Sequence, residues 1–209
     1  MRYQAVFFDF DGVILDSVHV KTKAFAAMFR QYGPKVERQV VDFHLANGGM
    51  SRFKKFEHYY RNILNMDISQ KELDLLGNKF SELALQGVIE SPFIPGAIET
   101  LKSLNSDQTP CFIASGTPDD EIKYIVQHKN LTTYFLEVHG SPKEKSAIVS
   151  EMIVKHNLAS NNCLFIGDAM SDYCAAQETG LNFLGIVKEQ TTSPFPEDTW
   201  VKKEVTLND

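Results

Sequence analysis

The stretch FFDFDGV, residues 7–13, decides the fold that we predict for this chain. Its first two residues are the end of a short run, residues 5–8, in which every residue is apolar. Such a continuous run is typical of a strand buried on both faces, as in a parallel sheet. Two carboxylates, Asp9 and Asp11, come directly after the run, and Gly12 lets the backbone turn sharply. Ligands of open α/β sheets bind at the carboxyl ends of the strands, so this pair of acids marks a candidate site.

Four later apolar runs resemble the first, and segments with the apolar spacing of helices separate them. Because strand and helix alternate from about residue 95 onward, we predict an α/β fold with a doubly wound, Rossmann-like parallel sheet. The tail over 191–209 is polar and contains proline, and we expect it to wrap the surface. The four runs are CFIA (111–114), FLEV (135–138), CLFI (163–166) and FLGIV (183–187).

About a hundred residues separate the first run from the second, and this interval has the spacing of helices instead of strands. We therefore predict an all-helical cap domain over residues 17–91, inserted into a core domain made of residues 1–16 and 92–209. Gly33 and Pro34 read as a helix stop within the cap. The expected helices cover 18–31, 52–64, 69–86 and 97–104, and the aromatic residues Phe53, Phe56, Tyr59 and Tyr60 are expected to form the core of the cap.

Composition and charge exclude several classes of function. The chain has 27 acidic and 21 basic residues and a formal net charge of −6, which argues against nucleic acid or a membrane surface as a partner. It has no apolar stretch long enough to span a bilayer, and we expect a cytoplasmic protein. Its three cysteines lack CxxC spacing and are expected to be reduced thiols. A small molecule is the expected partner, and the chain is expected to be a monomer or a weak homo-oligomer.

A second acidic motif, IGDAMSD, follows the run at 163–166. Asp168 and Asp172 in this motif, together with the pair at 9 and 11, form a plausible cradle for a hard divalent cation with oxygen ligands. Burying carboxylates at strand ends is costly unless a cation pairs with them. Taken alone, each acid has an ordinary alternative role as a turn or helix cap.

Two further motifs indicate an anion site. The segment ASGTP (114–118) supplies a hydroxyl and a glycine, and Thr117 is placed to cap a helix whose free N–H groups favour anions. The segment SPKEK (141–145) reads as a capping box on another helix. Lysine in a first helical turn opposes the helix dipole, which indicates an anion nearby, although simple capping explains each motif equally well.

The order of the four motifs resembles the haloacid dehalogenase-like hydrolase superfamily, in the branch that includes phosphoglycolate phosphatase and β-phosphoglucomutase. The motifs are Asp-x-Asp-Gly, Ser-Gly-Thr, Lys and Gly-Asp-x-x-x-Asp, and the resemblance covers nearly the whole chain, including the position of the cap. It implies a Mg²⁺-dependent phosphatase that acts on a small phosphorylated metabolite. A sugar phosphate or a phosphoglycolate-like acid is the implied substrate, and an aspartyl-phosphate is the implied intermediate.

The resemblance also implies a role for each acid. Asp9 is the expected nucleophile, and Asp11 is expected to protonate the leaving oxygen and then to deprotonate the attacking water. Mg²⁺ is expected to bind Asp9, Asp168 and the backbone carbonyl of Asp11. Asp172 is expected to support the metal, either directly or through water.

The phosphoryl oxygens are expected to contact Ser115 and a lysine, with Gly116 and Thr117 beside them. We favour Lys145 over Lys143 as that lysine, because Lys145 lies deeper in the first helical turn and precedes an apolar stripe.

Paired glycines mark the segment ANGGMSR (46–52), which the resemblance places at the substrate-specificity loop of the cap. Here we expect Asn47 and Arg52 to touch the leaving group. The alternative is a simple turn between helices with Ser51 as the N-cap.

Two other functions remain as alternatives. Mutases similar to β-phosphoglucomutase carry a histidine ten residues after the second aspartate, whereas this chain has Lys21 there and His19 two residues away. That departure disfavours a sugar phosphomutase. A non-catalytic, partner-binding subunit with the same fold is the alternative of another class, and the intact pair of Asp9 and Asp11 argues against it. Asp11 also favours cleavage of a C–O–P link, because a halide leaving group needs no proton.

Overall fold

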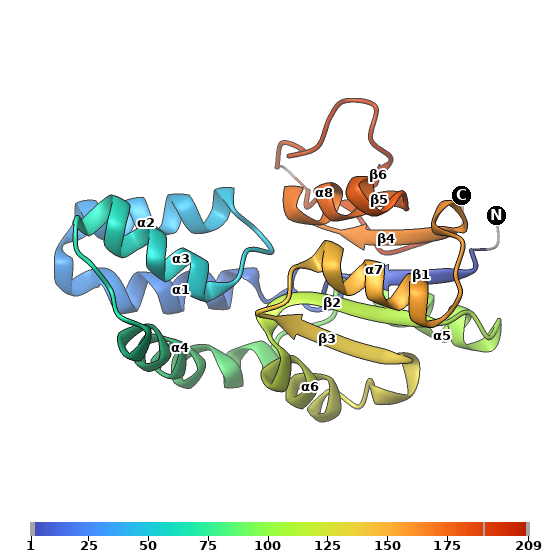
Figure 1. The fold of residues 1–209 in the computed structure, drawn as a ribbon, viewed down its shortest axis with the longest axis horizontal. Helices are drawn as coiled ribbons and strands as arrows, with labels where there is room; N and C mark the ends of the chain where they lie inside the picture. The colour runs from blue at the N-terminus through green and yellow to red at the C-terminus, as the bar shows by residue number, and fades with distance from the viewer. Residues whose placement is uncertain (1–2, 190, 208–209) are drawn as a thin grey trace.

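The computed structural model describes residues 3–189 and 191–207. Within these ranges, six strands form one parallel sheet with helices on both faces (Figure 1). The strand order is β3-β2-β1-β4-β5-β6, so the chain winds outward from β1 in both directions and the predicted doubly wound α/β fold is confirmed. The strands are β1 (Ala5–Phe8), β2 (Cys111–Pro118), β3 (Glu137–Ser141), β4 (Cys163–Gly167), β5 (Asn182–Ile186) and β6 (Val201–Lys202).

The helices that cover the sheet explain why β1 is apolar without interruption. Val6 and Phe8 pack with the helices on one face, while Ala5 and Phe7 pack with the helices on the other. Successive side chains of a strand point to opposite faces, so a strand covered on both sides has no solvent-facing position. One face carries α5 (Ala97–Ser106) and α6 (Asp119–His128), and the other carries α7 (Lys145–Lys155) and α8 (Met170–Thr179).

Four further helices form a separate group beside the sheet, at the left of Figure 1. Their aromatic residues make a cluster of their own, in which Phe25, Phe56, Tyr59 and Phe80 are almost fully buried. Of the four aromatic residues predicted for the cap core, Phe56 and Tyr59 are buried, whereas Phe53 and Tyr60 are half-buried and pack against the cluster. We call these the cap helices: α1 (Val18–Phe29), α2 (Pro34–Ala46), α3 (Arg52–His58, continued by a π-helical turn at Tyr59–Leu64) and α4 (Gln70–Glu90).

The local predictions were met in part. The helix stop predicted at Gly33 and Pro34 is confirmed, because the helical segment that starts with α1 ends at Tyr32. The helix α2 was not predicted; it begins at Pro34, a position where the missing N–H breaks no helical hydrogen bond. The strand expected at 135–138 begins at Glu137, after a 3₁₀ turn over Thr132–Tyr134. The tail does more than wrap the surface, because β6 pairs with β5.

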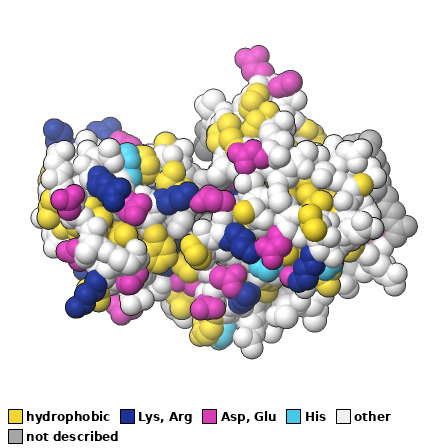
Figure 2. All heavy atoms as spheres, in the orientation of Figure 1, with side chains coloured by type: hydrophobic (Ala, Val, Ile, Leu, Met, Phe, Trp, Pro, Cys, Tyr) yellow, Lys and Arg dark blue, Asp and Glu magenta, His cyan; other side chains and the backbone are white. Residues whose placement is uncertain are grey.

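The surface is mixed in charge. On the face seen in Figure 2, acidic and basic side chains are interspersed. None of the helices in the described part of the chain combines the length and apolar character needed to cross a membrane.

Candidate active site

The carboxyl ends of β1 and β4 bring the two acidic motifs together. These strands pair in parallel, with Phe8 opposite Ile166, so Asp9 and Asp168 emerge side by side at one edge of the sheet. Gly12 lets the turn after Asp11 pass close to Asp168. Its φ is 87°, and a Cβ atom there would lie 2.1 Å from Asp168 Oδ2. No residue with a side chain fits this turn.

Three carboxylates and one ammonium form the centre of the site. Asp9, Asp168 and Asp172 each offer an oxygen within 4.8 Å of the others. Lys145 is buried at the start of α7, with Nζ 2.5 Å from Asp172 Oδ1 and 3.0 Å from Asp9 Oδ1. Asp172 also accepts a hydrogen bond of 3.1 Å from the backbone N–H of Ala169. Lys145 thus pairs with two of the three acids, Asp9 and Asp172.

Burial makes this excess of negative charge costly. It raises the pKa of Asp9 to about 7, with repulsion from Asp172 and Asp11 adding to the effect and Lys145 opposing it. Burial, with repulsion from Asp9 and Asp172, also raises the pKa of Asp168 well above its usual range. Burial disfavours the charge on Lys145, but Asp172 and Asp9 outweigh it and raise the pKa of that lysine. A divalent cation with oxygen ligands fits this donor set and would relieve the repulsion.

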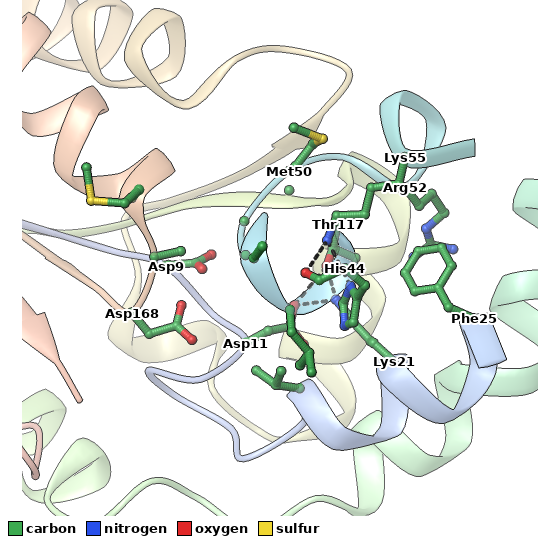
Figure 3. Close-up of a pocket in the computed structure, with 18 of the residues that line it drawn as sticks. Asp9, Asp11, Lys21, Phe25, His44, Met50, Arg52, Lys55, Thr117 and Asp168 are labelled. Atoms are coloured by element: carbon green, nitrogen blue, oxygen red, sulfur yellow. Dashed lines mark hydrogen bonds and ion pairs between the residues drawn. The ribbon is translucent and has the colours of Figure 1, made fainter. Parts of the chain in front are cut away.

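Asp11 lies apart from the three-carboxylate cluster and faces the cap (Figure 3). Its carboxylate accepts hydrogen bonds from Ser17 Oγ (2.5 Å) and Thr117 Oγ1 (3.1 Å) and pairs with the ammonium of Lys21. Burial favours the protonated acid, but Lys21 and the hydroxyl donors outweigh it and lower the pKa of Asp11. Lys21 stands ten residues after Asp11, where mutases similar to β-phosphoglucomutase carry a histidine. It favours the ionised form of Asp11.

The loop after β2 supplies the groups expected at the phosphoryl oxygens. Ser115 is buried, and its Oγ accepts a hydrogen bond of 3.2 Å from the backbone N–H of Thr117. Gly116 and Thr117 both line the cavity described below.

The structure separates the two candidate lysines. Lys145 is buried against Asp9, whereas Lys143 is about half exposed and pairs with Glu151. The capping box predicted at 141–145 is wrong: Ser141 ends β3, and α7 begins at Lys145 with Glu144 before it and no side-chain cap. β2 likewise continues through Thr117, so that residue does not cap α6.

The glycine loop between α2 and α3 closes over the site. Ser171 Oγ in α8 donates a hydrogen bond of 3.0 Å to the carbonyl of Gly48. A Cβ atom at Gly49, whose φ is 71°, would lie 2.1 Å from that same Oγ, and one at Gly116 would lie 2.2 Å from the carbonyl oxygen of Gly49. Backbone meets backbone here, which requires glycine on both sides.

The two cap residues predicted to touch a leaving group both make hydrogen bonds within the protein. The amide of Asn47 donates a hydrogen bond of 2.9 Å to the carbonyl of Phe43 in α2. Arg52 lines the cavity, but its guanidinium pairs with both oxygens of Glu121 in α6 and donates a 2.7 Å hydrogen bond to Ser81 Oγ. Arg52 therefore joins the cap to the core.

A cavity of about 150 Å³ lies between the cap helices and the carboxyl ends of the strands. Among the residues that line it, Lys55 and His44 were not singled out from the sequence. Lys55 Nζ lies 2.9 Å from His44 Nδ1. The sequence signal that could have pointed to Lys55 was its position one helical turn after Arg52, a residue predicted to touch the leaving group. The lining also includes Asp9, Asp11, Lys21, Arg52, Thr117 and Asp168.

Comparisons with known proteins find relatives that match most of the chain. A 5'-nucleotidase from Pseudomonas aeruginosa is 22% identical over 200 residues, covering 89% of this chain and 83% of the relative. A phosphoglycolate phosphatase from Vibrio parahaemolyticus is 24% identical over 188 residues, covering 86% and 81%.

Solved structures share the fold. A β-phosphoglucomutase from Clostridium difficile aligns with a TM-score of 0.74 at 17% identity, covering 89% of this chain and 85% of that one. A protein described as a predicted phosphoglycolate phosphatase from Haemophilus somnus aligns at 0.75 and 16% identity, covering 98% and 95%. The profile of the haloacid dehalogenase-like hydrolases matches residues 6–186, which is most of the chain. The chain therefore belongs to the haloacid dehalogenase-like hydrolase family and is a phosphoric monoester hydrolase.

Proposed function

We propose that this chain is a Mg²⁺-dependent phosphatase that hydrolyses a small phosphorylated metabolite through a covalent intermediate on Asp9. The arrangement of charge around Asp9 carries the proposal. A buried carboxylate at a strand end faces one ammonium and two further acids, and Asp11 stands separately on the cap side. This is the pair of functions that phosphoryl transfer to an enzyme carboxylate requires, a nucleophile and a distinct proton carrier.

In the first half-reaction, an oxygen of Asp9 attacks phosphorus and the bond to the leaving oxygen breaks. Asp11 gives its proton to that oxygen. Nucleophile and phosphoryl group are both anionic, so Lys145, which lies 3.0 Å from Asp9, lowers the repulsion between them. The negative charge of the bound substrate raises the proton affinity of Asp11. This offsets the effect of Lys21, so that Asp11 is protonated before the first half-reaction.

In the second half-reaction, water attacks the phosphorus and Asp9 leaves as a carboxylate. Asp11, now ionised, takes the proton of that water. Ser17, Lys21 and Thr117 hold the carboxylate in place and favour its ionised form, which is the form that acts as a base.

Asp9, Asp168 and the backbone carbonyl of Asp11 would hold Mg²⁺, with Asp172 either binding directly or through water. When bound, the ion neutralises charge on the phosphoryl oxygens. Ser115, Gly116 and Thr117 would bind those oxygens from the other side.

The test is phosphate release from a panel of small phosphomonoesters, measured with Mg²⁺ and with a chelator. We expect turnover only with Mg²⁺. Asp9→Asn should abolish it, because an amide is not a nucleophile toward phosphorus. The matched control is Asp67→Asn, which changes an exposed acid of the cap and should leave the rate unchanged. Turnover retained by Asp9→Asn contradicts the assignment.

One arm of the panel addresses the mutase alternative, since a β-phosphoglucomutase shares the fold. Incubation with a hexose 1-phosphate should give free phosphate and no hexose 6-phosphate, because Lys21 stands where mutases place a histidine. We also propose a cytoplasmic location and a monomer or weak homo-oligomer, the latter to be measured by analytical ultracentrifugation.

A further inference from the structure

Lys55 is a buried cation without a paired carboxylate among the described residues, although Asp11 and Asp168 attract it from a distance. Its side chain in α3 is 3% exposed, and it forms no ion pair with a carboxylate in the described part of the chain. Its Nζ contacts only His44, at 2.9 Å to Nδ1 and 3.4 Å to the backbone oxygen, and the ring of Phe25, at 5.7 Å to the centroid. Burying an ammonium with so little compensation is costly, so its place calls for an explanation.

The other cations on the cap side of the cavity are matched. Lys21 pairs with Asp11, and Arg52 pairs with Glu121. Of these three cations, Lys55 is the one without a paired carboxylate, so a group bound in the cavity would have to balance its charge. Burial, with repulsion from Lys21, lowers the pKa of Lys55 to about 7. A bound anion would favour the charged form again.

His44 acts as a support for Lys55. Burial and the charge of Lys55 lower the pKa of His44 to about 3, so its ring is neutral at physiological pH. Nδ1 of a neutral ring accepts a hydrogen bond, which together with the longer bond to the backbone oxygen of His44 orients the ammonium and leaves its third N–H for a ligand.

Lys55 faces the same cavity as the nucleophile, on the opposite side. Figure 3 shows Asp9 and Asp168 on one side and Lys55, Arg52 and Phe25 on the other. With a phosphoryl group at Asp9, the leaving group extends toward Lys55. The cavity of about 150 Å³ is smaller than the roughly 300 Å³ lower limit of drug-sized sites, which favours a leaving group of a few carbons over a nucleoside.

We propose that Lys55, oriented by His44, binds a second anionic group on the leaving group, so that the substrate is a small phosphorylated acid or bisphosphate. This inference rests on the proposed phosphatase function and narrows its substrate class. The second anion is a carboxylate or a phosphate, since both accept hydrogen bonds from an ammonium.

Matched substrate pairs test the proposal. The first pair is 2-phosphoglycolate and 2-hydroxyethyl phosphate, which differ by a carboxylate in place of a hydroxymethyl group. The second pair is glycerol 1,3-bisphosphate and glycerol 1-phosphate. We expect kcat/KM of the wild type to favour the anionic member of at least one pair about 100-fold, as for loss of a charged hydrogen bond. Which pair shows the preference identifies the second anion.

Variants assign the preference to Lys55. Lys55→Met should reduce it to within about threefold, by lowering kcat/KM for the anionic substrate and leaving the neutral one nearly unchanged. Lys55→Arg should retain part of it. His44→Phe removes the orienting nitrogen, keeps a ring of similar size, and should reduce the preference about tenfold. Lys79→Met changes an exposed lysine of α4 and is the control.

The outcomes separate this proposal from the proposed function. Hydrolysis of the anionic and neutral members at equal rates overturns the role of Lys55 and leaves the phosphatase assignment intact. A preference for the anionic member that survives in both Lys55→Met and His44→Phe has the same consequence. Absence of hydrolysis of every phosphomonoester tested, with Mg²⁺ present, overturns both.

Discussion

Arg52 of α3 and Glu121 of α6 form a two-pronged ion pair that fastens the cap to the core. Nη1 lies 3.0 Å from Oε2, and Nη2 pairs with Oε1. The side chains are 4% and 12% exposed, so water screens the pair little. The guanidinium also lies over the ring of Phe80, 4.5 Å from its centroid, which keeps it in one orientation. The pair holds the cap closed over Asp9.

Glu121→Ala should therefore destabilise the protein and loosen the cap. It leaves the buried Arg52 guanidinium without a counter-charge, which costs about 3 kcal/mol. For a chain of this size we expect a fall in Tm of roughly 6–12 °C, measured by calorimetry, together with a higher KM.

Lys54→Ala is the matched control for Glu121→Ala. It removes an exposed ion pair between the cap and the core, that of Lys54 with Glu144, whose side chains are more than half exposed. An exposed pair contributes about 0–1 kcal/mol, so Tm should change little. Equal effects of the two variants would show that burial of Arg52 is not what secures the cap.

Lys145→Met and Lys143→Met should differ strongly in activity. Lys145 is the buried ammonium between Asp9 and Asp172, and its loss should lower kcat/KM at least 100-fold, as for other preorganised charges at a reacting phosphoryl group. Lys143 pairs with Glu151 at the surface, so its variant should stay within about twofold of the wild type. Steady-state phosphate release measures both. A large loss in Lys143→Met alone would reverse the assignment.

Mg²⁺ should stabilise the folded protein, because it relieves repulsion among Asp9, Asp168 and Asp172. At an ion concentration 100 times the Kd, the gain is about 2.7 kcal/mol and is visible as a rise in Tm. Asp168→Asn should largely remove that rise and should raise Tm without metal, since it deletes one of the repelling charges. A Tm of Asp168→Asn that still responds to Mg²⁺ like that of the wild type would argue against this cluster as the site.

Glu137 should make stability depend on pH in the acid range. Burial opposes its ionisation, but hydrogen bonds from Lys155, His156 and His139 outweigh burial and lower the pKa of Glu137 to about 2, from an ordinary value of 4.5. A carboxyl with a lowered folded-state pKa stabilises the protein above the unfolded-state value and loses that contribution as pH falls toward 2. Glu137→Gln should cost about 1 kcal/mol at pH 7 and flatten urea-unfolding stability between pH 4.5 and 2. An unchanged slope in that range would contradict the assignment to Glu137.

The sheet and the acidic half of the site could be predicted from local patterns. A run such as 5–8 is apolar because both faces of the strand are covered, and the acids after it lie at the ligand-binding edge because the strands are parallel. Segments without such a pattern were missed. The stop at Gly33 and Pro34 was predicted, but the helix that begins at Pro34 was not, and β6 is too short to show a period.

The sequence by itself therefore determined the α/β alternation, the strand-end positions of Asp9 and Asp168, and the family. Only the tertiary structure decided which cation meets which acid: Lys21 pairs with Asp11, Arg52 pairs with Glu121, and Lys55 has no paired acid in the part of the chain that the structure describes. The physical reason is the separation along the chain of the residues that determine each feature. Backbone periodicity is set by neighbours a few residues apart, whereas the partner of a lysine or arginine on the cap depends on how four helices pack against one another and against a sheet edge far away in the chain.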